Sequence, residues 1–98
     1  TLPMISVGAV GVISVLSNIV PKLSADLCSL ALKGDYARAR KLHLKLFPLI
    51  KALFLETNPI PVKAAAAIKG LCHEEIRLPL LPMSAEPRAE LAKILKGF

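Results

Sequence analysis

The chain has 98 residues, of which 54% are hydrophobic and 4% aromatic, and it contains no tryptophan. Such a length allows at most one small domain, and the many aliphatic side chains favour the packing of helices against helices. The formal net charge of +6 raises the question of nucleic acid. Arg38, Lys41 and Lys45 share one helical stripe, but no aromatic residues lie between them to stack on bases, so we expect no nucleic-acid binding.

The first twenty residues carry no charge, and a stretch of this length could cross a membrane. Pro3, Gly8 and Gly11 interrupt it together with several polar residues, so we expect no transmembrane helix. No basic residues precede the first apolar run, which argues against a signal peptide. Because the chain begins at Thr1 and not at methionine, we expect that an upstream segment was removed.

Residues 2–7 are expected to form a short helix that ends at Gly8. The β-branched residues Val12, Ile13 and Val15 follow Gly11 in a short apolar run, a pattern typical of a strand that is buried on both faces. We therefore predict a strand over residues 11–15. Such strands need neighbours, and no other segment of the chain has a strand pattern of comparable strength.

Apolar periodicity and end signals predict four further helices, over residues 22–33, 36–55, 61–70 and 85–96. Gly34 and Asp35 join the first two of these as a hairpin, and Ser84 is expected to cap the last. The prolines at 59 and 61 predict a stiff extended joint over residues 58–61. Four alanines, residues 64–67, give the third helix a slim face for close packing. The expected fold is mainly α, with four or five helices and one short strand.

No residues have the spacing of a metal or catalytic site. Structural zinc sites use ligand pairs two to four residues apart, a spacing that the adjacent Cys72 and His73 lack. Distant Cys28 and Cys72 form no disulfide framework, which favours a reducing cytoplasm. The best candidate position is the C-terminal end of the predicted strand, because α/β enzymes bind substrates there. That position holds Ile13, Ser14, Ser17 and Asn18, although an ordinary strand end would look the same.

Several motifs in this order resemble one family, and the resemblance covers nearly the whole chain. They are Gly11-Val12-Ile13-Ser14-Val15 followed by Asn18, Gly34-Asp35-Tyr36 with Ala39-Arg40, Asn58-Pro59-Ile60-Pro61-Val62-Lys63, and Arg77-Leu78-Pro79 with Pro82. Together they are similar to the C-terminal third of the dihydrodipicolinate synthase family, one of the pyruvate-dependent Schiff-base aldolases.

The resemblance implies a (β/α)₈ barrel with an added C-terminal helical domain. Residues 1–21 would then belong to the last barrel segment, as an incomplete barrel, and residues 22–98 to the C-terminal helical region with the last barrel helix. The implied enzyme is a lyase that condenses pyruvate with aspartate semialdehyde through a Schiff base, in lysine biosynthesis. It implies homo-oligomers, as in the family's tetramers, and it calls for no cofactor and no metal.

The only site residue that the resemblance carries over is Ile13, whose main chain would line the pyruvate pocket. The Schiff-base lysine of the family lies upstream, so we expect no catalytic residue in this chain. A (β/α)₈ barrel needs about 250 residues, so we expect the chain to be inactive without the remainder of the barrel, and to self-associate through apolar residues 8–16. The alternative is a stand-alone helical interaction module that binds a partner through its hairpin and residues 2–20.

Overall fold

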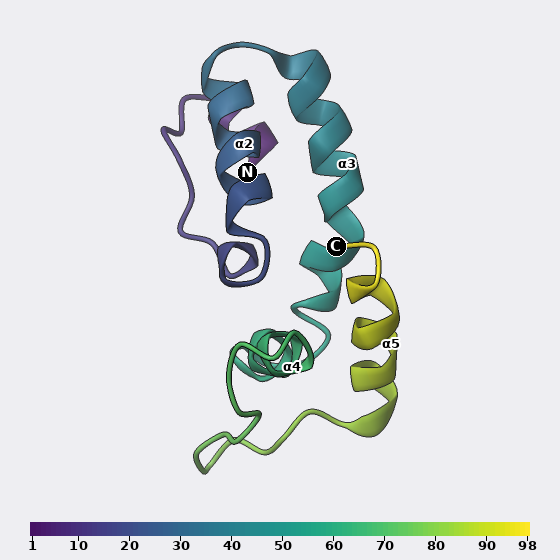
Figure 1. Cartoon of the computed structure of the whole chain (residues 1–98). Coiled ribbons are helices and arrows are strands. Elements are labelled where there is room, and N and C mark those ends of the chain that lie inside the picture. Colours follow the sequence, from purple (N-terminus) through teal and green to yellow (C-terminus); the bar gives the residue numbers. More distant parts are fainter. The chain divides into compact units, whose positions relative to one another are not determined.

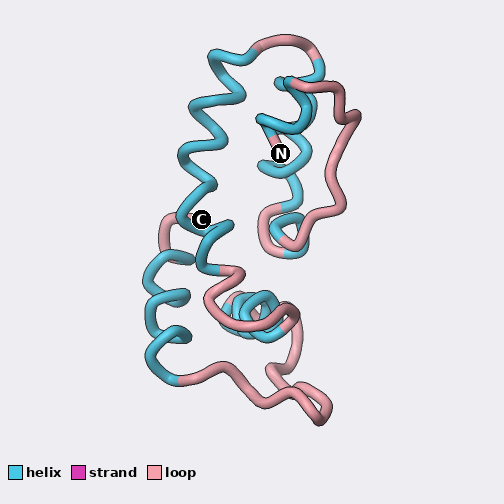
Figure 2. The backbone as a smooth tube through the Cα atoms, turned by 180° about the vertical axis from the view of Figure 1, so that it is seen from behind, coloured by secondary structure: helices cyan, strands magenta, loops and turns pink.

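A computed structural model describes residues 1–98. The chain is helical and contains no strand, which confirms the mainly α prediction (Figures 1 and 2). Its elements are α1 (Leu2–Ser6), the 3₁₀ turn η1 (Leu16–Asn18), α2 (Pro21–Leu32), α3 (Tyr36–Ala52), α4 (Ile60–Ile68) and α5 (Ala85–Leu95). The chain divides into two compact units, residues 1–47 and 48–98, with the boundary inside α3.

In the first unit, α1 and η1 pack against α2. The buried apolar side chains of this packing include Ile5, Leu16, Ile19, Val20, Leu27 and Ala31. Helix α2 begins at Pro21, because proline at the first helical position has no intrahelical hydrogen bond to lose. It ends at Leu32, and the φ of +76° at Gly34 lets the Asp35 amide donate to the Leu30 carbonyl at 2.9 Å.

Asp35 caps the start of α3. Its Oδ1 accepts a hydrogen bond of 3.1 Å from the Arg38 amide, and its Oδ2 accepts one from Arg38 Nε. The hydrogen bond from the Arg38 amide is the main cause that lowers the pKa of Asp35 from its ordinary value, and the bond from the Arg38 side chain is the second. The helix ends three residues before the predicted position 55, and it includes Pro48.

In the second unit, α4 packs against α5, as seen in Figure 1. The alanine face predicted for close packing is confirmed, since Ala64 and Ala65 are 1% and 0% exposed. Leu91 and Leu95 of α5 are also buried. Small side chains on α4 allow a close approach, and the helix that packs against α4 is α5 of the same unit.

The segment before α4 is a turn, so the expectation of an extended joint over residues 58–61 was wrong. The Ile60 amide donates to the Thr57 carbonyl at 2.9 Å, and Pro59 has φ −98° and ψ 18°. Proline restricts its own φ and the residue before it, but it leaves its own ψ free to turn. The helix accordingly begins at Ile60, with Pro61 in its first turn.

Ser84 is the N-cap residue of α5, but its side chain makes no capping hydrogen bond. Instead, its backbone amide donates to Oε1 of Glu56 at 3.1 Å. The predicted role of Ser84 was therefore right for its position and wrong for its hydroxyl. A carboxylate from the segment after α3 fixes the start of α5.

The predicted strand over residues 11–15 is absent, which corrects that expectation. Residues 9–14 form an irregular stretch, drawn as loop in Figure 2, and the peptide groups of residues 10–13 have no hydrogen-bond partner. A strand requires a neighbour to pair with, and this chain provides none. The side chains of Val10 and Ile13 are consequently 86% and 106% exposed.

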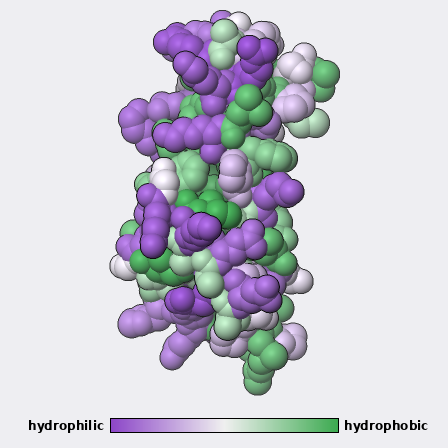
Figure 3. Space-filling model, turned by 90° about the vertical axis from the view of Figure 1, so that its right-hand side faces the viewer, coloured by the Kyte–Doolittle hydropathy of each residue, from purple (hydrophilic) through white to green (hydrophobic).

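Other exposed apolar side chains, among them Phe47 and Leu81, lie elsewhere in the chain. On the face shown in Figure 3, hydrophobic and hydrophilic residues are intermixed. No helix combines the length and the apolar character that crossing a bilayer requires.

Candidate functional site

The predicted site residues lie at the end of the irregular stretch, where the chain enters η1. Ile13 is fully exposed, and neither its amide nor its carbonyl has a partner. Ser14 comes next and is linked to Ser17 twice. The Ser17 amide donates to Ser14 Oγ at 3.2 Å, and the Ser17 hydroxyl donates to the Ser14 carbonyl at 2.7 Å. Ile13 is therefore the last residue without a hydrogen bond before a hydrogen-bonded turn.

The turn is fixed at its far end as well. Asn18 donates to the Val15 carbonyl twice, from its amide at 3.2 Å and from Nδ2 at 3.1 Å. Leu16 and Ile19 are buried, and η1 packs against α2. The structure thus brings the four predicted residues together, but it uses the polar side chains of Ser14, Ser17 and Asn18 for local hydrogen bonds.

The sequence contains a local signal for this turn. Serine and asparagine side chains form hydrogen bonds with backbone groups two or three residues away, and they favour turns for that reason. The spacing of Ser14 and Ser17 fits this behaviour. The pattern was interpreted as the end of a strand with possible ligand contacts, whereas the observed bonds are internal.

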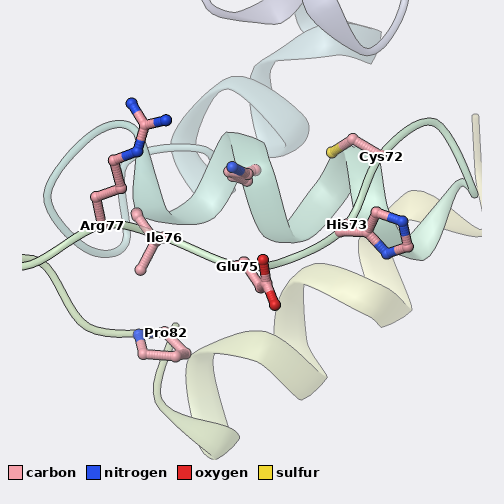
Figure 4. Close-up of a pocket in the computed structure, with 7 residues that line it drawn as sticks. Cys72, His73, Glu75, Ile76, Arg77 and Pro82 are labelled. Atoms are coloured by element: carbon pink, nitrogen blue, oxygen red, sulfur yellow. The ribbon is translucent and has the colours of Figure 1, made fainter.

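A second candidate is an open cavity of about 760 Å³ in the second unit, between α4 and the segment that leads to α5 (Figure 4). Its lining combines charged, polar and apolar residues: Lys63, Cys72, His73, Glu75, Ile76, Arg77 and Pro82. In Figure 4 the side chains of Arg77 and His73 lie at opposite ends of the segment and point in different directions. They do not converge on one point, as a general acid and base acting on one substrate must.

Glu74, which lies beside this cavity, is engaged elsewhere. Its carboxylate accepts hydrogen bonds from Arg88 Nε at 2.8 Å and Arg88 Nη2 at 2.6 Å. These side-chain bonds hold the pKa of Glu74 below its ordinary value of 4.5.

Neither the lysines nor the possible metal ligands form a reactive centre. A Schiff-base lysine needs a dry pocket, whereas Lys63 borders an open cavity and Lys69 is exposed, with Nζ 3.3 Å from the Phe98 carbonyl. No three His, Cys, Asp or Glu residues lie close enough together to hold a metal ion.

Comparison with known proteins shows the family to which the chain is similar. A model of the dihydrodipicolinate synthetase family matches residues 1–98, the whole chain. The chain belongs to this family. Its match corresponds to the C-terminal third of the family's proteins.

Among family members, the 4-hydroxy-tetrahydrodipicolinate synthase of Methanosarcina mazei is 57% identical over 96 residues. That of Methanocaldococcus jannaschii is 53% identical over the full chain. These alignments cover 98% and 100% of this chain, but 33% and 34% of the relatives. The chain therefore spans about a third of the length of the relatives that it matches.

Solved structures of the family have the same fold over this third. Dihydrodipicolinate synthase from Aquifex aeolicus superimposes with a TM-score of 0.96 at 51% identity, covering 98% of this chain and 33% of its own. A monomeric dihydrodipicolinate synthase variant gives a TM-score of 0.95 at 46% identity, over 99% of this chain and 32% of its own. The Acinetobacter baumannii enzyme, solved with pyruvate, gives a TM-score of 0.91 at 40% identity, and the match covers 98% of this chain and 33% of its own.

Proposed function

We propose that this chain forms the C-terminal third of a 4-hydroxy-tetrahydrodipicolinate synthase. The complete enzyme would be a lyase that condenses pyruvate with aspartate semialdehyde through a Schiff base on the way to lysine. The observation that carries the proposal is the match of all 98 residues to the family, with 57% identity to a synthase of this name. The nucleophilic lysine would be supplied by the other two thirds of the enzyme.

Residues 1–21 would contribute to the barrel, and residues 22–98 would form the helical region that follows it. The irregular stretch supports this division, because the free peptide groups of residues 10–13 are those that neighbouring barrel strands would pair with. At its end, the main chain of Ile13 would line the pyruvate pocket. Its unpaired amide and carbonyl are available for that role.

The partners of the chain would be the remainder of the barrel and further copies of the enzyme. Similarity does not fix the number of copies, since a monomeric variant is as similar in fold as the Aquifex aeolicus enzyme. We place the enzyme in the cytoplasm, because the free thiols of Cys28 and Cys72 suit a reducing compartment.

A chimera tests the proposal directly. This chain would replace the matching third of the Aquifex aeolicus synthase, whose backbone it follows with a TM-score of 0.96. We expect the chimera to condense pyruvate with aspartate semialdehyde, and to gain one pyruvate adduct by mass spectrometry after borohydride reduction. The control is the Aquifex aeolicus enzyme without that third, which should do neither.

The 98-residue chain alone should show only its unmodified 10.5 kDa mass after the same treatment. A folded chimera without an adduct would overturn the proposal and favour the alternative of a helical interaction module. An adduct on the isolated chain would show that it carries its own reactive lysine, contrary to the proposal.

A further inference from the structure

We propose that the hydroxyls of Ser14 and Ser17 position the Ile13 peptide for pyruvate, so that both serines are positioning residues of the enzyme. This inference rests on the proposed function. It assigns these side chains the task of holding the backbone on which a substrate contact depends, with no contact of their own to the substrate.

Hydrogen bonding of the backbone changes abruptly at Ile13. Residues 10–13 make no hydrogen bonds, whereas the next two carbonyls, those of Ser14 and Val15, both accept bonds from within the turn. The direction of the Ile13 carbonyl is set by the peptide plane that it shares with the Ser14 amide. Restraints on Ser14 therefore also limit the directions open to the free carbonyl of Ile13.

The two serines are joined by two hydrogen bonds. Ser14 accepts from the Ser17 amide through its hydroxyl, while the Ser17 hydroxyl donates to the Ser14 carbonyl. Both residues are only partly exposed. Ser17 donates both bonds, and together they restrain the hydroxyl and the carbonyl of Ser14, more than a single hydrogen bond would.

The turn that contains the serine pair is anchored by buried residues. Leu16 and Ile19 are 6% and 4% exposed, and the turn that contains Leu16 packs against α2. The serine bonds therefore connect Ile13 to the core of the first unit. Without them, Ser14 would be held to that core by the chain alone.

The pair should persist in the complete enzyme. Its bonds join residues three apart in sequence, so no other part of the protein is needed to form them. The solved relatives follow this chain over 98% of its length with TM-scores near 0.95, which supports the same backbone path in complete enzymes.

The test uses the chimera with Ser14→Ala, Ser17→Ala and the conservative Ser14→Thr. Misplacing a reacting group by a fraction of an ångström costs activity, and we expect the alanine variants to raise the KM for pyruvate about tenfold. The KM for aspartate semialdehyde should change little, and Ser14→Thr should restore the pyruvate KM because it keeps the hydroxyl. The control Ser29→Ala removes an exposed hydroxyl on α2. A general loss of folding would lower the amount of active enzyme, and so the apparent kcat, without a selective rise in the pyruvate KM, and it would not be rescued by threonine.

An active chimera whose pyruvate KM is unchanged by Ser14→Ala and Ser17→Ala would overturn the inference and leave the proposed function standing. An inactive parent chimera would overturn the proposed function instead. The inference would then be judged on the 98-residue chain by NMR relaxation at the amide of residue 14, which shares a peptide plane with the Ile13 carbonyl. We expect Ser14→Ala to increase fast motion there while α2 amides stay unchanged, and unchanged motion at residue 14 would overturn the positioning role.

Discussion

Arg88 holds Glu74 through two parallel hydrogen bonds, and so fastens the segment between α4 and α5 onto α5. The Nε–Oε1 and Nη2–Oε2 distances are 2.8 and 2.6 Å. This fork-to-fork geometry is the strongest form of an ion pair at a protein surface. The side chains are 41% and 29% exposed, so solvent screens much of the attraction.

We expect Glu74→Gln to lower the free energy of unfolding at neutral pH by about 1 kcal/mol, the upper range for a partly exposed pair. Because hydrogen bonds from Arg88 lower the pKa of folded Glu74, the unfolded chain binds protons first as the pH falls. The contribution is therefore complete above pH 4.5, the ordinary pKa, and disappears as the pH falls through the folded pKa. Urea unfolding at several pH values measures this. Glu90→Gln, on an exposed residue of α5, is the control; equal losses in both variants would contradict the prediction.

Gly34→Ala should destabilise the first unit by about 1 kcal/mol, because a side chain at positive φ meets its own backbone. No atom lies within 4 Å of the added Cβ, so the cost comes from the φ of +76° alone. Gly11→Ala is a matched control, since its Cβ also meets nothing and its φ lies outside the positive region. Chemical denaturation compares the two. Similar stabilities would show that the left-handed turn is not the reason for glycine at 34.

Ala65→Leu should destabilise the second unit by about 1–3 kcal/mol, the usual effect of overpacking a core. Ala65 is 0% exposed and belongs to α4, which packs against α5. The same substitution at exposed Ala89 of α5 should have little effect. Thermal unfolding followed by circular dichroism would reveal the difference. A stable Ala65→Leu variant would mean that the two helices can separate without loss.

The isolated chain should self-associate through residues 10–13, since exposed apolar side chains and free peptide groups on one extended segment favour pairing between copies. We expect Ile13→Lys to reduce the association, because a charge on such a segment opposes pairing. Leu81→Lys changes another exposed side chain, 64% accessible, and should leave it intact. Light scattering gives the mass of each. A monodisperse monomer of the unchanged chain would refute this expectation.

The helices could be predicted because their signals are local. Apolar periodicity, prolines at helix starts and the glycine at 34 act within a few residues, and the observed bounds of α2 differ from the predicted ones by one residue at each end. The joint at residues 58–61 could not be predicted, because the turn depends on a hydrogen bond from Ile60 to Thr57. The strand pattern at residues 11–15 describes a preference that only a partner strand can satisfy.

The candidate site was predictable in position and not in detail. Ile13 lies at the free end of the irregular stretch, where the strand interpretation and the family resemblance placed it, but its role stays a prediction. The two hydrogen bonds that Ser17 donates to Ser14 could be recognised only in the three-dimensional turn. The cavity bordered by Lys63 and Arg77 joins residues 14 apart, and no spacing rule relates a helix residue to a loop residue at that distance.

The free peptide groups of residues 10–13 also determine how long the chain would survive by itself. Proteases take up their substrates as extended, exposed backbone, and this stretch already has that form. In the 98-residue chain, limited proteolysis is therefore expected to cut between Ala9 and Ser14.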